Sequence, residues 1–407
     1  MNSLENLPGT RPQLAHLTAQ LDDLRERGTF FRLRVLDDEQ AAVCHYDGKQ
    51  VINLASNNYL GLCNHPKLRE AAIAATQKYG VGSGAVRTIA GTMRIHMELE
   101  EKIAAFKGVE ACVVFQSGFA ANAGTVSSIL GKEDFILSDE LNHASIIDGA
   151  RLSRAKIKVF RHKDVGHAEE LLKEIQNEPG RKLVITDGVF SMDGDIGPVG
   201  ELAALCEKYG AIMMVDDAHA SGVLGRNGRG SVDHFQCTGS VDVQVGTLSK
   251  AIGALGGYVC GSRDLIDYLY HRARPFLFST SHPPSVAASC IAAFDILESE
   301  PERIDRLWTN TSYFQGELKA AGFNIGGQTT PASETPITPI IIGDGRKTMD
   351  FSRALFDAGL MATGIAFPTV PDGKARIRCI MTSEHTRPQI DQALETLART
   401  ARRLEIL

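Results

Sequence analysis

Short apolar segments that alternate with helix-length segments constrain the fold of this chain more than any other feature. Between about residues 56 and 290, seven runs rich in branched and aromatic apolar residues recur, mostly separated by segments long enough to form a helix. Such runs between helices are typical of a mostly parallel sheet that is covered on both faces. The sequence therefore predicts an α/β fold. The expected strands are Ala111–Phe115, Phe135–Leu137, Lys158–Phe160, Leu183–Thr186, Ile212–Val215, Val241–Val245 and Gly257–Cys260.

The length and composition allow one large α/β domain and a smaller partner. The chain has 407 residues, and its 43% hydrophobic content excludes a disordered or fibrous protein. Residues 283 to about 322 are expected to form long helix with a break near Pro301, and the Gly-, Thr- and Pro-rich stretch 326–339 to form a link to a unit that ends in a charged helix. We expect an N-terminal arm (1–55), a large domain (56–295) and a small C-terminal α+β domain (296–407).

The arm is expected to begin with a helix over about residues 11–27. Candidate strands follow at Phe30–Leu36 and Val51–Leu54, with a turn at Asp47-Gly48 between them.

The first residues lack a basic region followed by an apolar one, so the sequence does not predict a secretory signal. No apolar run approaches the length of a membrane span. We therefore expect a cytoplasmic protein without a membrane partner.

Charge and cysteine spacing exclude two further classes. The net charge of −6 leaves no overall basic field of the kind that nucleic-acid-binding proteins carry, so no nucleic-acid partner is expected. The eight cysteines are scattered, with no C-x-x-C pair and no His/Cys ligand spacing. The sequence accordingly predicts reduced thiols and no metal site.

A lysine and a carboxylate follow two of the expected strands. Thr247-Leu-Ser-Lys250 comes after one strand, and Val215-Asp-Asp-Ala-His219 ends an earlier one. Pyridoxal phosphate (PLP) needs a lysine to carry it as a Schiff base, a carboxylate to hold a proton on its ring nitrogen, and small hydroxyl residues beside its phosphate. The sequence therefore predicts a PLP enzyme. Because adjacent strand residues point to opposite faces, only one of Asp216 and Asp217 can face the site, and the pattern leaves open which.

Other candidate groups lie where expected strands end. Ser117-Gly118-Phe119 opens a helix, whose N-terminal N–H groups attract phosphate. His143 offers a ring that can stack on the cofactor, and Ser191 offers a hydrogen-bond donor. His219 can bond the phenolic oxygen of the cofactor or a neighbouring carboxylate.

Arg376 and Arg378 alternate along a probable strand, so their guanidinium groups are expected to point the same way. Arginine is the usual clamp for the carboxylate of an amino acid. We expect one of the two to be this clamp and the other to form a surface ion pair.

Six segments together resemble the α-oxoamine synthases, which are fold-type-I PLP enzymes that join an amino acid to an acyl-CoA. The resemblance extends from about residue 20 to the C-terminus and implies a homodimer with active sites at the subunit interface. The segments that carry it are Ala55–Leu62, Gly82–Arg87, Leu141–Ser145, Thr186–Gly194, Val215–His219 and Thr247–Lys250.

The resemblance implies a role for each candidate residue. Lys250 becomes the Schiff-base lysine and the general base, Asp216 the partner of the pyridine nitrogen, and His143 the stacking ring and a donor to the acyl oxygen. His219 and Ser191 would contact the phenolic oxygen. The phosphate would be held by Thr247 with the Ser117, Gly118 and Phe119 turn, and by Ser279 and Thr280 of the second subunit. Asn57 and Arg378 would hold the substrate carboxylate.

Within this family the sequence looks most similar to the glycine C-acetyltransferases, so we expect condensation of glycine with acetyl-CoA to give 2-amino-3-oxobutanoate and CoA. The branched side chain of Val86, if it faces the substrate α-carbon, favours glycine over alanine. The alternative is 8-amino-7-oxononanoate synthase, which joins L-alanine to a pimeloyl thioester with loss of CO2, or an enzyme with both activities. An aminotransferase of the same fold would also keep Lys250 and Asp216, whereas a non-catalytic relative would be expected to lose them.

Overall fold

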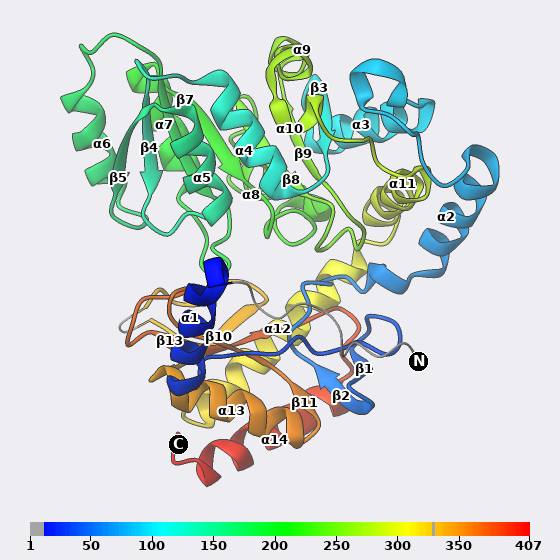
Figure 1. Ribbon diagram of the computed structural model, residues 1–407, viewed down its shortest axis with the longest axis vertical. Coiled ribbons are helices and arrows are strands. Elements are labelled where there is room, and N and C mark those ends of the chain that lie inside the picture. The colour runs from blue at the N-terminus through cyan, green and yellow to red at the C-terminus, as the bar shows by residue number, and fades with distance from the viewer. Residues whose placement is uncertain (1–11, 328–329) are drawn as a thin grey trace.

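The computed structural model describes residues 12–327 and 330–407, which form two lobes (Figure 1). The first eleven residues of the expected arm lie outside the described residues. The upper lobe contains the large sheet and its helices, and the lower lobe contains the two small sheets together with α1 (Ala15–Glu26), α13 (Gly345–Asp357) and α14 (Arg387–Arg403). Within the described ranges, no helix combines the length and apolar character that are needed to cross a bilayer.

The large sheet has seven strands in the order β3-β9-β8-β7-β6-β4-β5. Only β9 runs antiparallel to its neighbours, so the sheet is mostly parallel. All seven expected strands form, which confirms the predicted α/β fold. Their bounds are β3 (Ala111–Phe115), β4 (Phe135–Asp139), β5 (Lys156–Phe160), β6 (Lys182–Asp187), β7 (Ile212–Asp216), β8 (Val243–Thr247) and β9 (Gly257–Gly261).

Helices cover both faces of this sheet because its strands are apolar on both sides. On β7, Met214 packs into one core cluster, whereas Met213 and Val215 pack into another on the opposite face. The first face is covered by α4 (Gly118–Ile129), α5 (Ala144–Ser153), α9 (Arg263–Arg272) and α10 (Arg274–Leu277). The other face is covered by α3 (Arg94–Lys107), α6 (Val165–Glu174), α7 (Val199–Tyr209), α8 (Ser231–His234) and α11 (Pro284–Ser299), and α2 (Pro66–Tyr79) packs against α11.

The arm differs from its predicted strands in one place. β1 (Val43–Tyr46) and β2 (Lys49–Asn53) form a hairpin around Asp47 and Gly48, whose φ values of 51° and 72° suit an Asp-Gly turn. The expected strand at Phe30–Leu36 was wrong, because this stretch makes only an isolated bridge at Leu36 and the Val35 N–H bonds the Asp47 carboxylate instead. β2 also pairs in parallel with β11 (Leu360–Met361), which ties the arm to the lower lobe.

The C-terminal region follows the predicted order of elements. The break expected near Pro301 separates α11 from α12 (Glu302–Ala320). β10 (Ile337–Gly343) pairs with β13 (Ala375–Ile380), whose other edge is occupied by β12 (Thr363–Ile365). The predicted link was too long, because Pro339 lies inside β10. That position tolerates proline since β10 is an edge strand. Short helical turns occur at η2 (Pro12–Leu14), η3 (Leu62–Asn64), η4 (Arg87–Gly91) and η5 (Arg226–Gly228).

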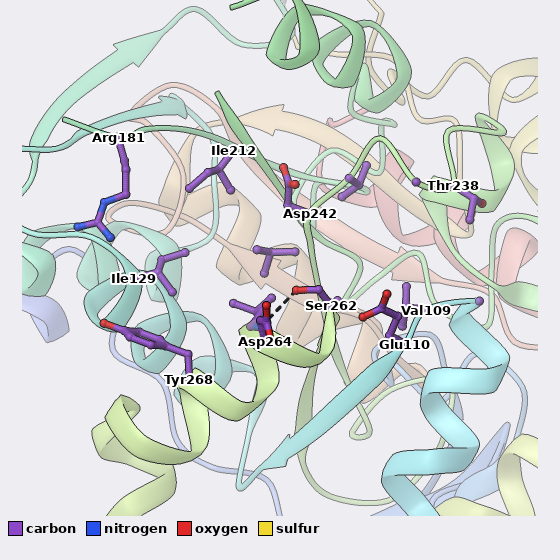
Figure 2. Close-up of a pocket in the computed structure, with 16 residues that line it drawn as sticks. Val109, Glu110, Ile129, Arg181, Ile212, Thr238, Asp242, Ser262, Asp264 and Tyr268 are labelled. Carbon is purple, nitrogen blue, oxygen red and sulfur yellow. Dashed lines mark hydrogen bonds between the residues drawn. The ribbon is translucent and has the colours of Figure 1, made fainter. Parts of the chain in front are cut away.

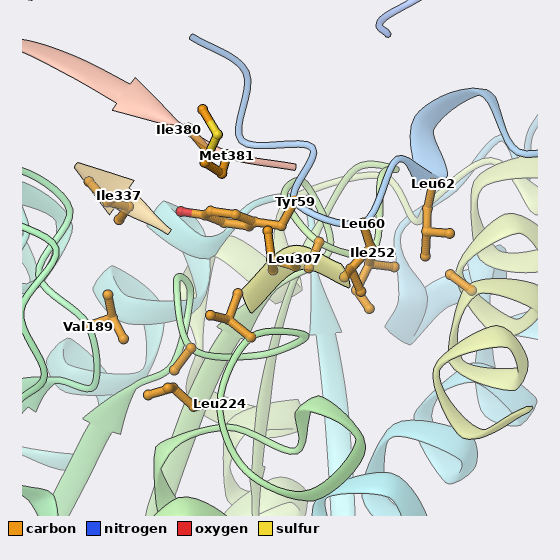
Figure 3. Packing of buried hydrophobic residues seen from close by; sticks show 14 of the residues in the cluster. Tyr59, Leu60, Leu62, Val189, Leu224, Ile252, Leu307, Ile337, Ile380 and Met381 are labelled. Carbon is orange, nitrogen blue, oxygen red and sulfur yellow. The ribbon is translucent and has the colours of Figure 1, made fainter. Parts of the chain in front are cut away.

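The two lobes share one apolar core around Tyr59. Figure 3 shows Tyr59 and Leu60 between Ile337, Ile380 and Met381 on one side and Val189, Leu224 and Ile252 on the other. Tyr59, Ile380 and Met381 are at most 1% exposed. The core therefore fixes the lower lobe against the strand ends of the large sheet.

Candidate active site

A cavity of about 200 Å³ lies at the carboxyl edge of the large sheet, where ligands bind in open α/β folds. Residues that follow β3, β4, β6, β7 and β8 line it. The structure brings together eight of the residues singled out in the sequence: Gly118, Phe119, His143, Ser191, Asp216, His219, Thr247 and Lys250.

Lys250 places its amine in this cavity from the loop after β8. Burial lowers the pKa of Lys250 to about 8, and the positive charge of Arg378 acts in the same direction while the negative charge of Asp216 opposes it. A lysine with this pKa is partly neutral near physiological pH. It can therefore act as a nucleophile or as a base.

The structure distinguishes the two adjacent aspartates. Asp216 lines the cavity and accepts hydrogen bonds from Asn122 Nδ2 at 2.6 Å and from the Ala218 N–H at 2.8 Å. Asp217 points to the other side of the strand, where its carboxylate lies 2.8 Å from Lys107 Nζ, with both side chains fully buried. Asp216 is therefore the carboxylate of the site.

The two histidines are neutral donors in this setting. Burial lowers the pKa of His143, and it lowers the pKa of His219 well below its ordinary value, helped by the positive charges of Lys250 and Arg378. The Ser145 N–H donates to His143 Nδ1 at 3.2 Å, so the ring hydrogen is assigned to Nε2. His219 Nδ1 lies 2.7 Å from the Tyr59 hydroxyl rather than beside a carboxylate. If the hydroxyl donates, the Nε2–H of His219 is left for the cavity.

The first turn of α4 forms one wall of the cavity. The Ser117 hydroxyl caps this helix by accepting from the Ala120 N–H at 3.1 Å, and Ser117 does not itself line the cavity. Gly257 permits this turn to approach β9, because a Cβ there would lie 2.3 Å from the Ser117 carbonyl oxygen. Gly118 and Phe119, the first residues of α4, line the cavity.

Arg378 and Arg376 point the same way along β13, as the alternation predicts, and have different partners. Arg376 forms an ion pair with Asp193, which is buried and not at the surface as the sequence predicted. Arg378 donates from Nε to the Ser191 carbonyl oxygen at 2.6 Å and from both Nη atoms to Asn57 Oδ1 at 3.3 Å. Within the described part of the chain, Arg378 has no carboxylate partner. Its hydrogen bond to Ser191, which lines the cavity, places Arg378 beside the cavity, where its guanidinium group can bind an anion.

Three predicted residues lie away from the cavity of their own chain. Val86 and Thr280 form an isolated bridge with each other, Thr280 is exposed, and Ser279 is half-buried next to it. Val86 therefore does not line the cavity of its own chain. Action of Ser279 and Thr280 in a second subunit stays a prediction.

Sequence reasoning missed several residues of the site. Asn122, Tyr59 and Ser145 act on the predicted residues through hydrogen bonds. Tyr59 and Ser145 lie inside segments that carry the family resemblance but were not singled out, and Asn122 lies outside those segments. Asp187 had a signal, since it directly follows the expected strand Leu183–Thr186 inside one of the family segments. The residues that line the cavity without having been singled out are Asn122, Ser145, Asp187, Val189, Ala218 and Ser249.

A larger hollow of about 910 Å³ lies at the opposite edge of the sheet, near the first residues of β7 and β8 (Figure 2). Its polar groups serve local structure. Asp242 accepts from the Met213 N–H, Glu110 accepts from the Arg263 N–H, and Ser262 caps α9. No lysine lines it. The smaller cavity therefore carries the chemistry despite its size.

The loop of residues 190–196 presents Ser191 and is held from both lobes. In the upper lobe, the His162 ring lies between two buried carboxylates, with Nδ1 2.9 Å from Asp139 Oδ1 and Nε2 2.8 Å from Asp195 Oδ2. In the lower lobe, Glu334 accepts from the Ile196 N–H at 3.0 Å, and Thr335 donates to the Gly194 carbonyl oxygen at 2.8 Å. Burial alone would lower the pKa of His162, but the two carboxylates outweigh it and raise this pKa to about 9.

The His162 cluster is expected to make stability depend on pH above neutrality. Because the folded-state pKa lies above the unfolded value near 6.5, this stabilisation is fully present below about pH 6.5 and is lost as pH rises through about 9. The wild type should have a larger free energy of unfolding than the His162→Gln variant. This difference between the two proteins should be about 3 kcal/mol larger at about pH 6 than at about pH 10. Urea denaturation of both proteins across this range measures the difference. If the difference in unfolding free energy between the two proteins did not change with pH, the conclusion that His162 is charged would be contradicted.

Comparisons with known proteins agree with this geometry. The family described as aminotransferase class I and II matches residues 49–397. The 8-amino-7-oxononanoate synthase of Symbiobacterium thermophilum is 56% identical over 391 residues, which are 96% of this chain and 98% of that protein. The 8-amino-7-oxononanoate synthase 1 of Bacillus subtilis is 54% identical with the same coverage. The solved serine palmitoyltransferase of Sphingomonas wittichii superposes with a TM-score of 0.92 at 31% identity, covering 97% of this chain and 99% of that one.

These relatives correct the reaction expected from the sequence. The expected substrates were glycine and acetyl-CoA, whereas near-full-length relatives at more than half identity are 8-amino-7-oxononanoate synthases. The preference for glycine over alanine that was inferred from Val86 is contradicted by the same relatives. One side chain beside a substrate carbon changes selectivity by about 1–3 kcal/mol only, so it was a weak basis for choosing the amino acid.

Proposed function

Since the chain belongs to the class I and II aminotransferase family, and within it to the PLP-dependent α-oxoamine synthases, we propose that it condenses L-alanine with a pimeloyl thioester to give 8-amino-7-oxononanoate. The enzyme is an acyltransferase. In the proposed reaction the α-carbon of alanine bonds to the thioester carbonyl carbon, the thiol of CoA leaves, and the alanine carboxylate is lost as CO2. The near-full-length identity to 8-amino-7-oxononanoate synthases carries the proposal.

The cavity residues fit PLP, the cofactor of this family. Asp216 is held as a hydrogen-bond acceptor by Asn122 and Ala218, which suits a protonated ring nitrogen. The first turn of α4 and Thr247 line the same cavity and suit a phosphate, because helix N-terminal N–H groups attract anions. Lys250 would hold the cofactor covalently through its amine. The bound group supplies an electron-withdrawing pyridinium ring that stabilises negative charge on the substrate α-carbon.

Lys250 Nζ is the group that would take the proton from the substrate α-carbon. Its pKa of about 8 leaves part of the amine neutral near physiological pH, as a base requires. His143 would stack on the cofactor ring, and its Nε2–H would donate to the acyl oxygen as negative charge develops there. His219, fixed by Tyr59, would donate to the phenolic oxygen together with Ser191.

Arg378 and Asn57 would bind the substrate carboxylate. Burial lowers the pKa of Arg378 from its very high ordinary value, yet a guanidinium remains charged in proteins. Its two hydrogen bonds to Asn57 and its hydrogen bond to the Ser191 carbonyl oxygen fix the orientation of the guanidinium group. We further propose a homodimer in which Ser279 and Thr280 of one subunit reach the phosphate site of the other. The exposure of Thr280 in the single chain is compatible with that arrangement.

The proposed substrates are tested by CoA release from PLP-loaded protein. L-Alanine and glycine are each assayed against pimeloyl-CoA and acetyl-CoA, with Lys250→Ala as the blank. We expect kcat/KM for L-alanine with pimeloyl-CoA to exceed that of the other three pairs. A dominant rate with glycine and acetyl-CoA would contradict the proposal.

A further inference from the structure

Two carboxylates lie side by side in the wall of the cavity. Asp187 ends β6 and Asp216 ends β7, and the two residues are register partners on these neighbouring parallel strands. Register partners on adjacent strands point to the same face of a sheet. Both side chains line the cavity, and the residues are only 5% and 4% exposed.

The two carboxylates have unequal hydrogen-bond partners. Asp216 accepts from Asn122 Nδ2 at 2.6 Å and from the Ala218 N–H at 2.8 Å, one donor on each oxygen. The carboxyl group of Asp187 accepts one bond, from the His143 N–H at 3.1 Å. Among the described residues, no lysine or arginine forms an ion pair with Asp187. Two buried neighbouring carboxylates cannot both ionise cheaply, and the one with more donors keeps the charge.

We propose that Asp187 keeps its proton and acts as a neutral positioning residue, which holds His143 in place and leaves Asp216 as the single negative charge of the pair. Its free oxygen then carries an O–H that can donate into the cavity. The inference rests on the cofactor of the proposed function and does not depend on which amino acid or thioester reacts.

The charged groups around Asp187 act in the direction of the proposal. Burial raises the pKa of Asp187 well above its ordinary value, the neighbouring charges of Asp216 and Asp139 reinforce this effect, and Lys250 opposes it. Asp139 is itself paired with the protonated His162, which limits its influence. The His143 ring, the remaining titratable group of the cavity on this side, has a pKa lowered by burial and adds little positive charge.

Infrared spectroscopy of the apo-protein tests the proton directly. At about pH 8, ordinary aspartates with pKa values near 4 are ionised, so a carboxylic-acid C=O band marks a carboxyl group with a raised pKa. We expect this band in the wild type and its loss in Asp187→Asn. The wild-type band, assigned by isotope-labelled aspartate, remains informative even if the variant folds poorly. Absence of the band at about pH 8 would overturn the proposal.

Cofactor affinity supplies the matched comparison. Asparagine reproduces the shape and donor of a neutral acid, so Asp187→Asn should weaken PLP binding by at most about three-fold. Asp216→Asn removes the charge opposite the ring nitrogen and should weaken it by about ten-fold or more. Equal losses in the two variants would show that Asp187 is ionised. Neither measurement contains amino acid or thioester, so failure here leaves the proposed reaction standing, and failure of that reaction leaves this inference standing.

Discussion

Replacing Lys250 with alanine is expected to lower kcat by about a thousand-fold or more while the protein remains folded. Lys250 is the one amine among the described residues that line the cavity, and the substitution removes both the covalent attachment of the cofactor and the proposed base. CoA release under saturating L-alanine and pimeloyl-CoA measures the loss. Circular dichroism checks that the fold is retained.

The matched control is Lys173→Ala. Lys173 lies in the last turn of α6 with 54% of its side chain exposed, pairs with Glu169 and does not line the cavity. We expect this variant to keep the wild-type rate. If Lys250→Ala retained a tenth of the wild-type kcat, the assignment of Lys250 would be wrong.

Changing each of the adjacent aspartates to asparagine is expected to impair a different property of the protein. Asp216→Asn should keep the stability of the fold but weaken cofactor binding and lower kcat, because the ionised acceptor held by Asn122 is lost. Asp217→Asn should instead lower the free energy of unfolding by about 3–5 kcal/mol, since Lys107 would stay buried without a partner charge. Urea denaturation and PLP titration of both variants separate the two effects.

A double variant provides the control for the buried pair. Lys107→Met combined with Asp217→Leu removes both charges and is expected to recover most of the stability lost in Asp217→Asn, as replacement of buried ion pairs by apolar residues often does. If Asp217→Asn abolished cofactor binding while Asp216→Asn did not, the placement of Asp216 in the cavity would be contradicted.

Local sequence patterns predicted the strands of the large sheet, because the apolar character of each strand is visible in its own residues. Apolar runs such as Ala111–Phe115 form buried strands wherever they are flanked by helices, so the seven strands and their carboxyl-edge residues followed from the sequence. The segment Phe30–Leu36 has a similar composition but meets β1 only through the isolated bridge between Leu36 and Tyr46. Its conformation depends on a tertiary contact with Asp47 that no local pattern reveals.

The site shows the same division between local and long-range determinants. Lys250 and His143 were found because each follows a strand in a recognisable segment. The choice between Asp216 and Asp217 required knowing which face of β7 the cavity occupies, and Tyr59 reaches His219 from a segment distant in the chain. Substrate choice was mispredicted because the motifs of the family report its shared cofactor chemistry, whereas the acyl and amino-acid partners differ by small steric effects.

The most direct test of the central claim is release of labelled CO2 from carboxyl-labelled L-alanine with pimeloyl-CoA, measured together with CoA. The account expects CO2 and CoA to appear in equal amounts, with 8-amino-7-oxononanoate identified as the product by mass spectrometry and no turnover in Lys250→Ala. CoA release without CO2, or turnover only with glycine and acetyl-CoA, would contradict it.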